Sequence, residues 1–261
     1  MTTSPAKATP IDSQARSVIT EAAVTEPFTS GRAAPRLLFD FAVMLSLLKQ
    51  SVLQSPVLDF GAGTGWISEF CVRLGLVTVA FDIHGDLKAC LENRARADAR
   101  IDEQLLSFCH GDGHAMPFGG NFFGHLLCYD TLHHMHDYPK VFSEFFRVLQ
   151  PGGRGIFVEP GARHSTSPET IAFVEAQKKH DPSWIERDVV LDEIDEIARG
   201  AGFSAGLSII PMPHPLVLPI YSMRDWNQFR SGDTRQRLLL TDQLAALNYW
   251  DRVIFVVDKP E

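Results

Sequence analysis

Residues 57–65 read Val-Leu-Asp-Phe-Gly-Ala-Gly-Thr-Gly, an apolar segment that runs directly into a glycine-rich loop. The apolar residues predict a buried strand. The glycines predict a sharp turn whose backbone can touch a ligand, because glycine has no Cβ at the contact points. A helix beginning at Gly65 or Trp66 would direct unpaired N–H groups and a positive dipole end at this turn. The stretch therefore predicts a strand–loop–helix unit suited to an anionic ligand group.

A second apolar segment, residues 76–81, is followed by Asp82. A carboxylate at the tip of a neighbouring strand can accept hydrogen bonds from both hydroxyls of a ribose, so the two segments favour a nucleotide-type cofactor. Dinucleotide-binding loops need G-x-G-x-x-G, but the third glycine position is here Trp66 and the glycine stands one place earlier, at Gly65. From these residues alone, a glycine-rich turn without a ligand remains an alternative.

The composition limits the classes of function. The 261 residues are 45% hydrophobic, enough for one large domain with a sizeable core, and the net charge of −8 argues against a nucleic-acid partner. The cysteines lack C-x-x-C spacing, which indicates buried thiols rather than zinc ligands or disulfides. Because no secretory signal and no bilayer-spanning apolar stretch is found, we expect a cytoplasmic protein without a membrane partner.

Strand-like and helix-like segments alternate between residues 56 and 159. The expected strands are 56–60, 76–81, 105–110, 124–129 and 154–159, and the expected helices are 65–74, 85–97 and 138–148. This rhythm is typical of βαβ units. We therefore expect an α/β fold with a doubly wound, Rossmann-like sheet and helices on both faces.

The flanking regions are patterned differently. Residues 1–33 are rich in Thr, Ser, Ala and Pro and are expected to form a disordered arm, which places the domain at 34–261. After residue 160 the alternation weakens. The expected elements there are helices at 166–180 and 190–199, the latter ended by Gly200, strands at 205–212 and 251–258, and an insertion at 213–245.

Acidic residues stand at or just past the ends of five expected strands: Asp59, Asp82, Asp112, Asp130 and Glu159. In a parallel sheet these ends lie along one edge, where the ligands of α/β folds bind. Asp112 is followed by Gly113, so a carboxylate that can accept a bond from an exocyclic amine stands beside backbone that a flat ring can approach. Solvation alone is a poor explanation for five equivalent placements.

Five motifs in this order resemble the class I S-adenosylmethionine (SAM)-dependent methyltransferases of the type 11 group, over residues 55–160. They are the loop Asp59–Gly65, Asp82, Asp112-Gly113, the stretch from Asp130 to His133-His134, and Leu149-Gln-Pro-Gly-Gly153. The resemblance implies a seven-stranded sheet with an antiparallel last strand. It also implies an enzyme that transfers a methyl group from SAM to a small-molecule acceptor and leaves S-adenosyl-L-homocysteine.

The resemblance further implies which residues bind SAM. The loop glycines would cradle its methionine part, and Asp82 would hold its ribose. Asp112 would meet the adenine amine, while Asp59 and Asp130 would line the loop near the aminoacyl end. The predicted set of cofactor contacts is Asp59, Gly61, Ala62, Gly63, Gly65, Asp82, Ile83, Asp112, Gly113 and Asp130.

SAM already holds an activated methyl group, so the protein mainly has to place nucleophile, methyl and sulfur in line. If the acceptor needs a general base, His133 and His134 are the candidates, because they follow a strand end and titrate near neutral pH. Packing in the core is the alternative for each. Glu159 either contacts the acceptor or caps a helix. No metal is expected, since His133, His134 and His136 do not share one face of a helix or strand.

The acceptor is expected to bind among residues 160–245, the least patterned part of the chain. Residues 159–165 resemble a stretch of bacterial methyltransferases that modify carbohydrates or surface polysaccharides, and secondary metabolites are the other acceptor class considered. Two alternatives to the enzyme remain. One is a non-catalytic SAM-binding regulatory or partner subunit. The other is an NAD-dependent oxidoreductase, which Trp66 in the third glycine position disfavours.

Overall fold

The computed structural model describes residues 25–31, 33–161, 163–179, 181–210 and 252–261, with scattered residues between 222 and 238. The prediction of a disordered arm therefore lies mostly outside the described residues. The same holds for most of the predicted insertion at 213–245 and for its expected contribution to the acceptor pocket.

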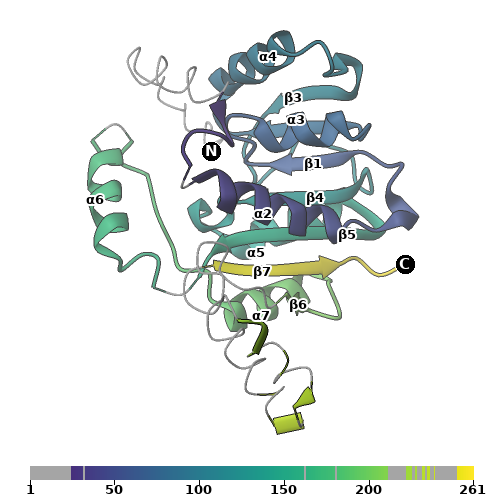
Figure 1. Cartoon of the computed structure of the whole chain (residues 1–261). Helices are drawn as coiled ribbons and strands as arrows, with labels where there is room; N and C mark the ends of the chain where they lie inside the picture. Colours follow the sequence, from purple (N-terminus) through teal and green to yellow (C-terminus); the bar gives the residue numbers. More distant parts are fainter. Residues whose placement is uncertain are drawn as a thin grey trace, which may run out of the picture.

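One seven-stranded sheet organises the described chain (Figure 1). Its strands are Val57–Phe60 (β1), Thr78–Asp82 (β2), Leu106–His110 (β3), Phe123–Tyr129 (β4), Leu149–Pro160 (β5), Leu207–Ile209 (β6) and Arg252–Asp258 (β7). Their order in the sheet is β3-β2-β1-β4-β5-β7-β6. Strands β1 to β5 are parallel, and β7 is antiparallel to both β5 and β6. The predicted doubly wound sheet with an antiparallel last strand is confirmed.

Helices cover both faces of the sheet (Figure 1). They are Ala33–Ser46 (α2), Trp66–Arg73 (α3), Lys88–Ala97 (α4), Tyr138–Val148 (α5), Pro168–Gln177 (α6) and Leu191–Ala201 (α7), with 3-10 turns at Gln50–Val52 (η1), Gly85–Leu87 (η2), Glu103–Leu105 (η3) and Leu132–His134 (η4). Among the described helices, none combines the length and the apolar character that crossing a bilayer requires.

Side-chain alternation along β1 divides the core into two layers. Leu58 and Phe60 pack into the layer that α5 and α7 cover, whereas Val57 packs into the layer that α2 and α3 cover. Successive residues of a strand point to opposite faces, and all four residues of β1 are buried because helices lie on both sides. The apolar run before the glycine loop is therefore a central strand.

Differences from the sequence expectation are most informative in α7, β6 and β5. Helix α7 continues through Gly200 and ends at Gly202, whose left-handed φ of 116° suits the C-terminal cap. Among the described residues of the predicted strand at 205–212, only Leu207–Ile209 are paired as β6. Residues 149–153, whose proline and glycines are typical of a turn, form an irregular start of β5, where the pairing shifts from Phe123–Leu149 to His125–Arg154. Proline and glycine composition marks such a bulge as readily as a turn.

Candidate functional site

The glycine loop leaves β1 with three residues in left-handed backbone conformation. The φ angles of Gly61, Gly63 and Gly65 are 71°, 53° and 77°. A Cβ at Gly61 would overlap the side chain of Thr131, and one at Gly65 would overlap Leu91. These two glycines therefore let the loop pack closely against its neighbours.

Gly63 differs from the other two, because a Cβ there would meet only the Gly61 carbonyl oxygen at 4.0 Å. The space that a side chain of residue 63 would occupy is therefore open. Helix α3 then begins at Trp66 without a side-chain cap on its first turn. A loop with bare backbone beside an uncapped helix start fits the aminoacyl and sulfonium part of SAM.

Asp82 closes β2 directly beside this loop. Its carboxylate accepts hydrogen bonds from the Gly63 N–H, at 3.0 Å, and from the His84 N–H, at 2.8 Å. Burial raises its pKa above the ordinary value, and these bonds oppose that shift. Each carboxylate oxygen accepts one of the bonds and has a further lone pair, so a ribose diol can still be held. The residues present therefore fit the predicted cofactor.

The residues predicted to contact adenine differ in how accessible they are to a ligand. Ile83 is exposed, and Asp112 follows β3 with an exposed carboxylate that accepts the Nδ1–H of His114 at 2.7 Å. Gly113 lies against the Phe60 ring, since a Cβ there would come to 2.5 Å from that ring. The missing side chain of Gly113 is thus already required by packing, while Ile83 and Asp112 remain open to a ligand.

Two other predicted contacts have partners in the fold. Asp59 is buried and accepts a bond from the Ser68 hydroxyl of α3 at 2.6 Å, and burial raises its pKa to about 7. Asp130, with a left-handed φ of 46°, lies 3.3 Å from the guanidinium of Arg252 and 3.9 Å from that of Arg36. Asp59 therefore ties β1 to α3, and Asp130 ties the end of β4 to β7 and α2.

Behind the glycine loop, Glu159 organises the turn after β4. This carboxylate is fully buried and accepts the N–H groups of Thr131, at 3.1 Å, and Leu132, at 2.9 Å. It also accepts the Nδ1–H of His133 at 2.8 Å. The Thr131 hydroxyl reaches the Gly61 carbonyl at 3.2 Å, so the turn is joined to the glycine loop. Glu159 thus caps the preceding turn η4 rather than the helix that follows it.

A second carboxylate, Glu186, reaches the same histidines from the extended segment before α7. It lies 3.1 Å from Nε2 of His133, 2.8 Å from Nε2 of His164 and 3.5 Å from Nδ1 of His134. The Trp184 indole N–H also donates to it at 2.9 Å. We call the group Glu159, Glu186, His133, His134 and His164 the imidazole–carboxylate cluster. The sequence does not predict Glu186, because it stands in a segment without periodicity.

The two histidine candidates differ in their chemistry. Burial lowers the pKa of His133, but its bonds to Glu159 and Glu186 outweigh this and raise it to about 10. Burial and the charge of His133 lower the pKa of His134. The neutral His134 ring places Nδ1 at 3.0 Å from the Ile185 carbonyl as donor, which leaves the Nε2 lone pair for a proton. The geometry therefore favours His134 over His133 as a general base.

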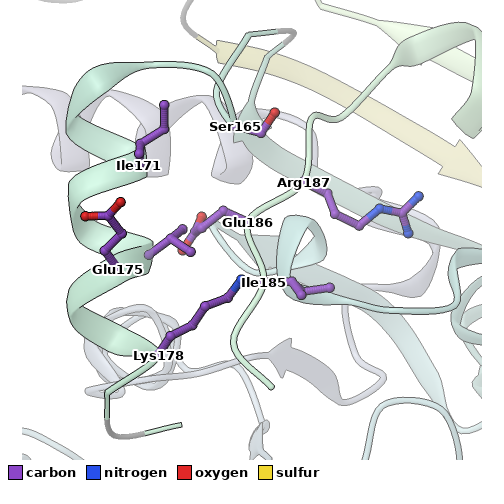
Figure 2. Close-up of a pocket in the computed structure, with 8 residues that line it drawn as sticks. Ser165, Ile171, Glu175, Lys178, Ile185, Glu186 and Arg187 are labelled. Atoms are coloured by element: carbon purple, nitrogen blue, oxygen red, sulfur yellow. The ribbon is translucent and has the colours of Figure 1, made fainter. Parts of the chain in front are cut away.

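A cavity of about 340 Å³ lies next to this cluster. Figure 2 shows α6 on one side, with Ile171, Glu175 and Lys178, and the segment containing Ile185, Glu186 and Arg187 on the other. The Arg187 side chain points away from α6 and stacks over the Tyr138 ring at 3.9 Å. The cavity is therefore bounded by Glu186 itself and by a helix that stands off the carboxyl ends of the parallel strands (Figure 1).

Comparison with known proteins yields one family model, described as a methyltransferase domain, over residues 58–157. The chain is 32% identical over 160 residues to the biotin biosynthesis bifunctional protein BioHC of Saccharophagus degradans, covering 56% of this chain and 26% of that protein. It is 36% identical over 104 residues to a demethylmenaquinone methyltransferase of Renibacterium salmoninarum, covering 40% of each. The chain thus spans well under half the length of these curated relatives.

Among solved structures, phosphoethanolamine N-methyltransferase 2 of Haemonchus contortus in complex with SAM aligns with a TM-score of 0.64 at 19% identity. The alignment covers 94% of this chain and 57% of that chain, and it supports the fold. The region matched by the family model contains the glycine loop, Asp82 and both histidine candidates. It ends before Glu159, so Glu159, His164 and Glu186 of the imidazole–carboxylate cluster lie beyond it.

Proposed function

Because residues 58–157 are a class I SAM-dependent methyltransferase domain, we propose that the protein transfers a methyl group from SAM to a small-molecule acceptor. One observation supports this most directly. Gly63 presents open backbone to the same space in which the Asp82 carboxylate ends, and the N–H of Gly63 is bonded to that carboxylate. The part that binds the sulfonium side chain and the part that binds ribose are therefore mutually aligned.

When bound, SAM supplies an electrophilic methyl group, so the chain's own contribution is orientation and proton transfer. Gly61, Gly63 and Gly65 would hold its aminoacyl end, and Asp82 would hold its ribose. Ile83 and Asp112 would receive its adenine. An acceptor hydroxyl beside the turn η4 transfers its proton to Nε2 of His134, while Glu159 fixes that turn relative to the glycine loop.

The acceptor enters from the side of α6 in this proposal, because the cavity there opens beside Glu186. Carbohydrates are the acceptor class favoured by the sequence of 159–165, and secondary metabolites are the other class considered. The demethylmenaquinone and biotin-pathway relatives align over less than half of their own length. We therefore place quinols in the acceptor panel beside sugars and polyketides.

Calorimetry with SAM and with NADH tests the cofactor. We expect SAM to bind and NADH not to bind, and we expect Asp82→Ala to weaken SAM binding about 10- to 100-fold through lost hydrogen bonds to ribose. The control Glu92→Gln, on the exposed face of α4, should bind like the wild type. Equal affinity of Asp82→Ala and wild type would remove Asp82 from the site.

Transfer of labelled methyl from SAM to the acceptor panel then tests the reaction. Turnover with at least one acceptor is expected, and His134→Asn should lower kcat more than it changes KM for a hydroxyl acceptor. Tight binding of SAM without turnover in the panel or in cell extracts would favour the regulatory-subunit alternative.

A further inference from the structure

The imidazole–carboxylate cluster brings together donors that are far apart in the sequence. His133 and His134 come from the turn η4, His164 from the chain after β5, and Glu186 from the segment before α7. One ligand atom from each of His133, His134 and Glu186 can be chosen so that all three lie within 4.8 Å of one another. The spacing of the histidines in sequence disfavours a metal only while Glu186 is left out of the set.

The separations within the cluster match those between ligands of one ion. Nitrogen and oxygen ligands about 2.0–2.2 Å from a divalent ion lie about 3.0–3.5 Å apart at octahedral or tetrahedral angles. The observed N–O separations to the Glu186 carboxylate are 3.1 Å from Nε2 of His133 and 3.5 Å from Nδ1 of His134. Binding through Nδ1 requires the His134 ring to give up its bond to the Ile185 carbonyl and to carry its proton on Nε2. His164 Nε2, 2.8 Å from the same carboxylate, is a further donor within reach.

The surroundings hold these donors in place. Glu159 accepts the Nδ1–H of His133 at 2.8 Å, so Nε2 is the nitrogen that faces Glu186, and it can bind an ion that displaces its proton. The indole N–H of Trp184 donates to Glu186 at 2.9 Å. Carboxylate–histidine–metal arrangements of this kind fix the tautomer and orientation of a ligating imidazole. The His133 side chain is only 6% exposed and that of Glu186 only 3%, which limits competition from bulk water.

We propose that His133, His134 and Glu186 bind a divalent transition-metal ion, with zinc as the expected occupant. Two imidazoles and one carboxylate suit zinc, and three protein ligands leave a coordination position for water or for an oxygen of a ligand. Glu186 also lines the cavity of about 340 Å³. The inference does not require the proposed methyl transfer.

The metal site and the general-base role of His134 exclude each other. A neutral imidazole has one lone pair, which goes either to a proton or to the ion. The metal-free protein should therefore be the form in which His134 acts as a base. If zinc is bound, an acceptor oxygen on the ion loses its proton more readily, and a base matters less.

Metal content tests the proposal on the full chain with its purification tag removed. The protein is stripped with a chelator, dialysed, and titrated with Zn²⁺, and Co²⁺ serves as a spectroscopic probe. We expect about one Zn²⁺ per chain and a visible Co²⁺ absorption band. Glu186→Gln should weaken Zn²⁺ binding about 100-fold, and Glu159→Gln, which acts through His133, about 10-fold.

The control is His136→Asn, which removes an exposed imidazole two positions beyond His134 and should bind Zn²⁺ like the wild type. If Glu186→Gln fails to fold by circular dichroism, His134→Asn, at a partly exposed position, provides the same comparison. Less than about a tenth of an equivalent of Zn²⁺ in the wild type would overturn the site. So would wild-type affinity in both Glu186→Gln and His134→Asn. SAM binding is measured in parallel, so loss of the metal site leaves the proposed methyl transfer separately testable.

Discussion

The strand before the glycine loop and the imidazole–carboxylate cluster bury carboxylates under opposite conditions. In that strand, Asp59 is buried with a serine hydroxyl as partner, and burial raises its pKa to about 7. In the cluster, burial opposes ionisation of Glu186, but hydrogen bonds from His133 and His164 prevail and hold its pKa well below the ordinary value. Burial therefore favours the neutral form of one acid and leaves the other charged, depending on the groups around it.

The largest expected effect is a pH dependence that comes from Asp59. Its pKa is 3.8 when unfolded and about 7 when folded, so folding takes up a proton between these values. The stability contribution is fully present below pH 4, falls as the pH rises toward 7, and stays low above 7. About three pKa units correspond to about 4 kcal/mol.

Asp59→Asn keeps a side-chain oxygen for the Ser68 hydroxyl and removes this titration. Urea unfolding of both proteins between pH 4 and pH 8 measures the difference. The stability of the variant relative to the wild type should rise between pH 4 and about pH 7 and change little from there to pH 8. A difference that does not change with pH would show that Asp59 is not a neutral acid in the fold.

A smaller effect is expected where a buried cation holds the glycine loop. Arg94 donates to the Thr64 carbonyl at 2.7 Å, to the Glu26 carbonyl at 2.9 Å and to the Glu69 carboxylate at 2.7 Å. Arg94→Ala leaves Glu69 with Arg73 as a partner and removes one of the links between Glu26 and the glycine loop, where the Thr64 hydroxyl still donates to the Glu26 carboxylate. We expect a loss of about 3 kcal/mol in unfolding free energy.

The matched control is Lys88→Ala on the same helix, because Lys88 forms an exposed ion pair with Glu92. That change should cost less than about 0.5 kcal/mol. Similar losses in both variants would mean that burial does not distinguish these two ion pairs.

A comparison of two glycines with left-handed backbone separates the cost of conformational strain from the cost of close packing. Both Gly61, in the loop, and Gly75, after α3, have positive φ, at 71° and 80°. A Cβ at Gly61 would overlap Thr131, whereas one at Gly75 meets nothing within 4 Å. Gly75→Ala should cost about 1 kcal/mol from strain alone. Gly61→Ala should cost about 1–2 kcal/mol more, because Thr131 must move. If thermal unfolding shows equal losses of stability for Gly61→Ala and Gly75→Ala, the Thr131 side chain moves aside without a measurable cost.

The contrast between the glycine-loop region and the imidazole–carboxylate cluster also explains what the sequence can predict. The strand–loop–helix unit, the acids at the strand ends and the sheet class follow from local patterns, and the family resemblance and the fold class are confirmed. The sequence predicts Glu159 as a cap or an acceptor contact, but its cap lies on the preceding turn. Glu186 cannot be found from local patterns, because its role depends on an extended segment returning to η4. The prediction that no metal binds considers only the spacing of neighbouring histidines in the sequence and leaves Glu186 out.

The smallest expected effect lies at the end of α7, which differs from the sequence prediction. Gly200 lies inside the helix, and a Cβ added there would meet nothing within 4 Å, whereas Gly202 provides the left-handed cap. Gly200→Ala should therefore stabilise the protein by about 0.5 kcal/mol, since alanine favours helix and restricts the unfolded chain. Gly202→Ala is the opposite control, because its φ of 116° and the Phe146 ring at 2.7 Å both oppose a side chain. If thermal unfolding instead ranks Gly200→Ala below the wild type, the helix ends at Gly200, as the sequence pattern suggests.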